Sequence, residues 1–76
     1  MTRKDYILIA EHANQLIEAL ETDLSYMRGK YGDGPETDRV ESERDGAKQA
    51  LQTIAYALRQ DNPRFDGNKF LKACGI

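Results

Sequence analysis

Apolar residues recur along the N-terminal part of the chain at alternating spacings of four and three. Side chains three and four residues apart lie above one another on an α-helix, so this spacing places them on one helical face. The pattern therefore predicts a long amphipathic helix that packs against a partner. Its apolar positions are Tyr6, Ala10, Ala13, Ile17, Leu20, Leu24 and Met27.

Local signals predict that this first helix spans about residues 3–30. Thr2 and Asp5 match a capping box, in which the hydroxyl accepts an amide of the first turn and the carboxylate lies at the positive helix end. Gly29 is the first helix-weakening residue, and no proline precedes it. A turn rich in glycine follows, which we expect over residues 31–36.

A second amphipathic stretch predicts a helix over about residues 37–61. Asp33 or Thr37 is the candidate N-cap, and the helix must stop before Pro63, because the residue before a proline disfavours the helical conformation. Two long helices joined by a short turn predict an antiparallel hairpin. The apolar positions of the second helix are Val40, Ala47, Ala50, Leu51, Ile54, Ala57 and Leu58.

The C-terminal segment predicts a short third helix at about residues 67–74. Asp66 is a good N-cap, and Phe65 and Phe70 occupy the two positions of a hydrophobic staple around it. Gly75 fits the position just after the helix, where a left-handed conformation is common. The helix is therefore bounded by its own local sequence at both ends.

A helix of two turns is not stable alone, so we expect the third helix to pack on the hairpin. The surface we predict for this contact is Ile7 and Leu8, covered by Phe65, Phe70 and Leu71. The chain is then one all-α domain over residues 1–76. Its predicted architecture is an antiparallel helical hairpin plus a short C-terminal helix.

The first helix carries more apolar surface than one partner helix can cover. Antiparallel pairing about the turn puts Leu24 opposite Glu43 and Arg44 rather than opposite apolar residues. Contiguous exposed apolar patches are typical of interaction sites. We therefore expect a partner face made of Ile9, Leu16, Leu24, Met27 and Tyr31.

Three interpretations of this surplus surface remain open. Two hairpins could form a four-helix bundle, which we favour because soluble oligomers are mostly symmetric dimers. The surface could instead dock a different protein, or the chain could be a monomer with a frayed tip. Size supports the first, since a core of 76 residues supplies only roughly 3–5 kcal/mol and a single cysteine forms no intramolecular disulfide.

The titratable residues do not form a recognisable catalytic or metal-binding pattern. His12 is the only histidine and has no identifiable nucleophile or orienting acid nearby in the sequence. Cys74 fits a small buried side chain of the third helix better than a reactive thiol. We therefore predict that the chain is not an enzyme and has neither a cofactor nor a metal site.

Charge and hydropathy favour a soluble protein that does not act mainly on nucleic acid, and the lone cysteine suits a reducing compartment, which predicts the cytoplasm. Charged residues make up 32% of the chain, the net charge is −2, and no segment reaches the roughly 18–20 apolar residues that span a bilayer. A basic and aromatic cluster at the hairpin tip nevertheless could contact a phosphate backbone and a stacked base. Its members are Arg28, Lys30, Tyr31 and Arg39.

Two segments resemble a family of small proteins encoded in tailed-phage and prophage genomes. The stretch DNPRFDGNKFLKACG, residues 61–75, is similar to their ending D-N-P-R-F-D-x-x-x-F-L-x-A-C-G, and RKDYILIAE is similar to their start R-x-D-Y-x-x-I-A. The resemblance implies a phage origin and action in the host bacterial cytoplasm, with no assigned activity. The matching tail residues transfer as fold determinants: Asp61, Pro63, Phe65, Asp66, Phe70, Leu71, Ala73, Cys74 and Gly75.

These observations lead to two functional hypotheses. The first is a non-enzymatic phage accessory protein that binds other proteins as a homodimer and inhibits or redirects a host protein such as a defence complex. The alternative is a nucleic-acid or nucleotide binding protein that uses the basic and aromatic tip. Salt dependence separates them, because binding to a phosphate backbone weakens steeply with salt.

Overall fold

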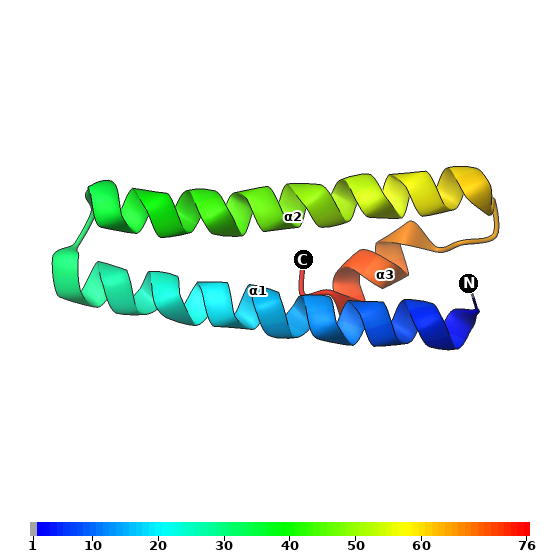
Figure 1. The fold of residues 1–76 in the computed structure, drawn as a ribbon, viewed down its shortest axis with the longest axis horizontal. Coiled ribbons are helices and arrows are strands. Elements are labelled where there is room, and N and C mark those ends of the chain that lie inside the picture. Colours follow the sequence, from blue (N-terminus) through cyan, green and yellow to red (C-terminus); the bar gives the residue numbers. More distant parts are fainter. Residues whose placement is uncertain (1) are drawn as a thin grey trace.

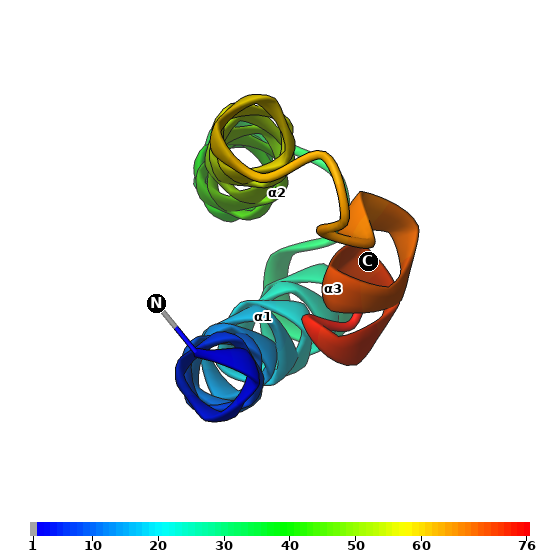
Figure 2. The same ribbon diagram turned by 90° about the vertical axis from the view of Figure 1, so that its right-hand side faces the viewer.

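The computed structural model describes residues 2–76, which fold into three helices with no β-strand among them. They are α1 (Arg3–Tyr31), α2 (Pro35–Asp61) and α3 (Gly67–Ala73). The two long helices run antiparallel along a molecule 44 Å in length (Figure 1). The short helix α3 packs against both of them, on one side of the plane that they form and in the half of the molecule where α1 begins (Figure 2). The predicted helical hairpin with a short C-terminal helix is confirmed.

The ends of α1 are set by local hydrogen bonds. The Thr2 hydroxyl accepts the Asp5 amide at 3.4 Å, and the Asp5 carboxylate accepts the Thr2 amide at 3.0 Å, which completes the predicted capping box. At the other end Gly32 has a φ of 67°, a conformation that favours glycine, and its amide donates to the Arg28 carbonyl. The helix ends at Tyr31, one residue later than expected.

The start of α2 differs from the prediction, because the helix begins at Pro35 rather than at residue 37. Proline suits the first helical position, where its missing amide would be unpaired in any case. Gly34 is the N-cap, and no side chain caps this end. The expected capping by Asp33 or Thr37 is therefore wrong, and the turn shortens to residues 32–34.

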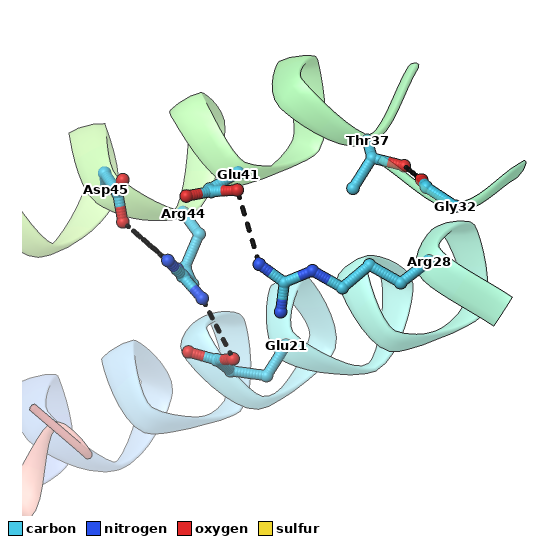
Figure 3. Close-up of polar contacts among 7 residues, drawn as sticks. All are labelled: Glu21, Arg28, Gly32, Thr37, Glu41, Arg44 and Asp45. Carbon is cyan, nitrogen blue, oxygen red and sulfur yellow. Dashed lines mark hydrogen bonds and ion pairs between the residues drawn. The ribbon is translucent and has the colours of Figure 1, made fainter. Parts of the chain in front are cut away.

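Thr37 ties the two long helices together at the tip instead. Its side chain is 1% exposed, and its hydroxyl donates to the carbonyl of Gly32 (Figure 3). The bond satisfies a carbonyl at the end of α1 that would otherwise lack a partner. Thr37, which was expected to cap α2, therefore stabilises the turn by binding the residue that follows α1.

The segment that leads into α3 follows the predicted pattern. The Asp66 carboxylate accepts the Lys69 amide at 3.0 Å, and the rings of Phe65 and Phe70 pack with their centroids 5.5 Å apart as a staple. Gly75 has a φ of 85°, as its position predicts. The helix ends at Ala73, one residue early.

The three helices meet in a small core at Ala10, Ala55, Phe70 and Cys74. The expectation that α3 would cover Ile7 and Leu8 is wrong, since these side chains remain 50% and 53% exposed. The small side chains of Ala10 and Ala55 let Phe70 and Cys74 of the C-terminal segment approach both long helices closely. This segment therefore packs beside Ala10 and leaves much of Ile7 and Leu8 exposed.

Candidate functional site

The third helix covers one side of the hairpin and leaves the other uncovered. Gly75 lies against Asn14 and Ile17 of α1, and Gly67 lies against Ala55 of α2. Figure 2, which looks along the long helices, shows α3 on one side of the plane that contains α1 and α2. On the opposite side, residues 2–76 provide no further element.

Helical geometry identifies the residues on that opposite side. On each long helix these residues recur at spacings of three and four and so form a stripe. The stripe lies next to the residues that face the other long helix. It is on the side opposite to the residues that contact α3. We call this surface the open face. It consists of Ile9, Ala13, Leu16 and Leu20 of α1 and Ala47, Ala50, Ile54 and Leu58 of α2.

The open face is composed of apolar residues, and both helices contribute large and small side chains to it. Ile9, Leu16 and Ile54 are 37%, 53% and 45% exposed. The small residues are Ala13 on α1 and Ala47 and Ala50 on α2. An apolar surface of this kind at the joint of two helices is typical of a protein interface.

The residues of the partner face predicted from the sequence differ in their exposure. Ile9 and Leu16 are exposed and belong to the open face. Met27 is half-buried and lies seven residues beyond Leu20, so it continues the same stripe toward the tip. Tyr31 is 50% exposed but lies at the end of α1, away from the other members.

Leu24 does not belong to an exposed face, because it is 2% exposed and therefore part of the core. The side chains one turn before and one turn after it reach across to α2. Glu21 pairs with Arg44 at 3.4 Å, and Arg28 pairs with Glu41 at 3.3 Å (Figure 3). Glu21 also pairs with Lys48 at 3.3 Å.

The aliphatic parts of these long side chains cover apolar surface while their charged ends remain in water. The Arg44 side chain illustrates this, since only 18% of it is exposed although it joins both Glu21 and Asp45. The prediction that Leu24 is exposed considered only apolar residues as able to bury it. Long charged side chains of both helices can also do so, and the prediction was therefore wrong.

The α2 half of the open face was missed from the sequence. Ala47, Ile54 and Leu58 were assigned to the contact between the two long helices. The sequence nevertheless contained an indication of this surface, because the apolar residues of α2 cover a wider part of the helix circumference than one partner helix can bury. The apolar residues that α1 does not bury lie on the open face.

The basic and aromatic residues of the tip are not gathered on one surface. Arg28 points toward α2, where Glu41 neutralises it at 3.3 Å. Lys30 lies two residues further on, about 200° around the helix, and contacts the rings of Tyr26 and Tyr31 at 5.7 and 5.2 Å. Binding of nucleic acid by this cluster stays a prediction, and the separation of Arg28 from Lys30 weakens it.

The remaining titratable residues are placed as follows. His12 is exposed on α1, and no group of three or more potential metal ligands occurs in the part of the chain that the structure describes. Cys74 is fully buried, and burial raises the pKa of its thiol above the ordinary value. A thiol in this state is a poor nucleophile.

No protein-family model, curated protein or solved structure matches this chain. Across residues 2–76, none of the helices has a stretch long and apolar enough to cross a membrane. Functional inference for this protein therefore starts from its open face and from the distribution of its charges.

Proposed function

We propose that this chain is a non-enzymatic helical protein that acts by binding other proteins, and that the open face is its interface with a second copy of itself. One observation carries the proposal. Ile9, Leu16 and Ile54 are all substantially exposed on the side of the hairpin that α3 leaves uncovered. Burying them in a four-helix bundle would remove this apolar surface from water.

The composition of the open face allows it to pack against a second copy of itself. In a twofold dimer the same patch lies on both sides of the interface, and each contact occurs twice. A second hairpin can place its α1 over the first subunit's α2, so that Leu16 meets Ala50 and Ile54 while Ile9 lies near Leu58. Apolar residues then cover apolar residues in both halves of the interface.

The dimensions of the molecule are also suitable. The whole side of the hairpin measures about 44 by 19 Å, on the order of 800 Å², and the open face occupies about 17 Å of its length, over residues 9–20 and 47–58. Stable protein interfaces bury about 800 Å² on each partner. The open face contributes an uncharged centre to this side, which is the usual composition of an interface core.

Sedimentation equilibrium over a concentration series tests the dimer. We expect the wild-type protein to reach twice the 8.6 kDa mass of one chain. The Leu16→Glu variant should remain at the mass of one chain, because dimerisation would bury an unpaired carboxylate. Circular dichroism should show the helical content of the variant unchanged, since Leu16 is 53% exposed in the single subunit.

Leu8→Glu is a matched control. Leu8 is the same residue type on the same helix with the same 53% exposure, but it lies on the outer side of α1. We expect this variant to dimerise like the wild type. A wild-type mass of one chain at every concentration, or equal loss of dimer in both variants, would refute the proposed interface.

We further propose that the dimer modulates a host protein, such as a component of a defence complex, in the cytoplasm of a bacterial cell. The resemblance of residues 61–75 and of the chain's start to phage proteins supports this proposal. Immobilised protein should retain a host protein that rebinds when both are purified. If none of the retained proteins rebinds in purified form, this part of the proposal fails while the dimer can still stand.

A further inference from the structure

A pocket of about 400 Å³ opens on the α3 side of the molecule, away from the open face. Its walls are aromatic: the ring centroids of Tyr6 and Phe65 are 4.7 Å apart, and those of Phe65 and Phe70 are 5.5 Å apart, with the rings tilted against one another. Ile7 lines the same pocket and is half exposed. This volume lies at the lower end of the range for small-molecule sites.

Positive charges converge on this apolar pocket from three separate elements. Arg3 comes from the start of α1, Arg64 from the segment before α3, and Lys69 from α3 itself. Asp66 is the one acidic residue of the lining, so the lining carries a charge of +2 in a chain whose net charge is −2. The lining is therefore positively charged although the chain as a whole is negatively charged.

These cations are also available to a ligand. The ion pairs formed within residues 2–76 use Arg28, Arg44 and Lys48, and none of them involves the cations of the pocket. The Asp66 carboxylate is already occupied in part, because it accepts the Lys69 amide at 3.0 Å as the cap of α3.

We propose that this pocket binds a small amphiphilic acid, namely a single aromatic or short aliphatic body that carries one carboxylate. The apolar body would lie against Tyr6, Phe65 and Phe70, where its burial removes apolar surface from water. The carboxylate would remain at the mouth of the pocket beside Arg64 and Lys69, where charge-assisted hydrogen bonds are available. This site is independent of the proposed dimer, since it lies on the other side of the hairpin.

An NMR titration with naphthoate tests the proposal. We expect saturable amide shifts confined to residues 3–10 and 62–73, which surround the pocket. Naphthamide has the same shape without the charge, and it should bind at least about fivefold more weakly, the ratio that corresponds to about 1 kcal/mol from an exposed ion pair. Absence of saturable shifts in these segments, or equal binding of the amide, would overturn the proposal.

A pair of variants localises the charge effect. The double variant Arg64→Gln and Lys69→Gln should weaken naphthoate binding at least about fivefold without changing that of naphthamide. Lys72→Gln removes a charge from the same helix at a position outside the pocket lining and should leave the affinity unchanged. If Lys72→Gln weakens binding as much as the double variant, the attraction is nonspecific and the proposal is wrong.

Discussion

Leu24 is buried in a part of α1 whose neighbouring side chains are charged. Glu21 and Arg28 lie one turn to either side of it and pair with residues of α2. Because these ion pairs lie at the surface, their Coulomb energy is small and screened by salt. Long charged side chains can cover apolar surface with their aliphatic parts, and we account for the burial of Leu24 in this way.

Replacing Leu24 by alanine tests its place in the core. We expect Leu24→Ala to lower the free energy of unfolding by about 2–5 kcal/mol, because truncation of a buried leucine removes apolar burial and leaves a cavity. Urea unfolding at a fixed protein concentration measures the change. The exposed Leu8 provides the control, and a loss no larger than that of Leu8→Ala would show that Leu24 is not core.

Thr37 offers a second prediction at the scale of one side chain. The Thr37→Val variant keeps the shape but removes the hydroxyl that donates to the Gly32 carbonyl. We expect a loss of about 0.5–1.5 kcal/mol in unfolding free energy, since the variant loses a part-buried hydrogen bond that joins α2 to the end of α1.

Thr53→Val is the matched control for Thr37. The Thr53 hydroxyl also donates to a backbone carbonyl, that of Gln49, but this residue is exposed and water can replace the bond. Urea unfolding should therefore show almost no change for Thr53→Val. Equal effects of the two substitutions would contradict a special role for the tip.

Among the elements, α3 depends most on interactions with neighbours. It has seven residues, which is too short for independent stability, and it is held by the Asp66 cap and by the burial of Phe70 and Cys74. Opening of α3 exposes Cys74, so reaction of this thiol reports the stability of the element.

The cap of α3 can be tested through this thiol. We expect Asp66→Ala to raise the labelling rate of Cys74 by an aromatic disulfide reagent about fivefold, because loss of an N-cap destabilises a helix by about 1 kcal/mol. Asn68→Ala, on the same helix but outside the cap, should leave the rate nearly unchanged. Rapid labelling of the wild-type protein would contradict the complete burial of Cys74.

The lowered pKa values of two carboxylates of α1 allow a prediction of how the stability of the protein depends on pH. The Thr2 amide lowers the pKa of Asp5 below its ordinary value of 3.8, and Lys48, followed by Arg44, lowers the pKa of Glu21 below 4.5. A pKa that is lower in the folded state favours folding above the ordinary pKa, and this contribution is lost as the pH falls through the folded-state pKa.

The melting temperature should therefore decrease on acidification below these ordinary values. The combined variant Asp5→Asn and Glu21→Gln should be less stable than the wild type at neutral pH and should lose less stability in acid. Thermal melts from neutral to strongly acidic pH measure both effects, with Asp33→Asn in the turn as a control. A decrease equally steep in the combined variant and in the wild type would show that other groups dominate.

On the scale of the whole molecule, the arrangement of α3 gives the hairpin two different sides. One side carries α3 and the cationic pocket, whereas the other carries the uncharged open face. Because the two proposed sites occupy different sides, a dimer through the open face leaves the pocket accessible. Assembly and ligand binding can therefore be tested separately.

The proposed dimer predicts that thermal stability depends on protein concentration. Dimerisation stabilises only the folded chain, so the melting temperature of the wild type should rise as the concentration increases. The Leu16→Glu variant should show no such rise, and Leu8→Glu should follow the wild type. A wild-type melting temperature independent of concentration would contradict the dimer.

The three helices and the local signals that bound α1 and α3 could be predicted from the sequence, whereas the N-cap and the first residue of α2 were predicted wrongly. The Thr2 capping box, the Asp66 cap with its Phe65 and Phe70 staple, and the glycine at position 75 all involve partners within a few residues. Such interactions are determined by local sequence whatever the rest of the chain does. The exposure of Ile9 and Leu16 was also predictable, because the apolar arc of the first helix exceeded the width of one partner.

The side of the hairpin that α3 covers and the enclosure of Leu24 were decided only by the tertiary structure. Both depend on residues far apart in the chain: α3 packs against Ala10 and Ala55, and Glu21 reaches Arg44 and Lys48. Hydropathy patterns show how wide an apolar surface is, but the residues that cover it are known only once the helices are placed. For that reason the α2 half of the open face and the cationic pocket emerged from the packing of the three helices.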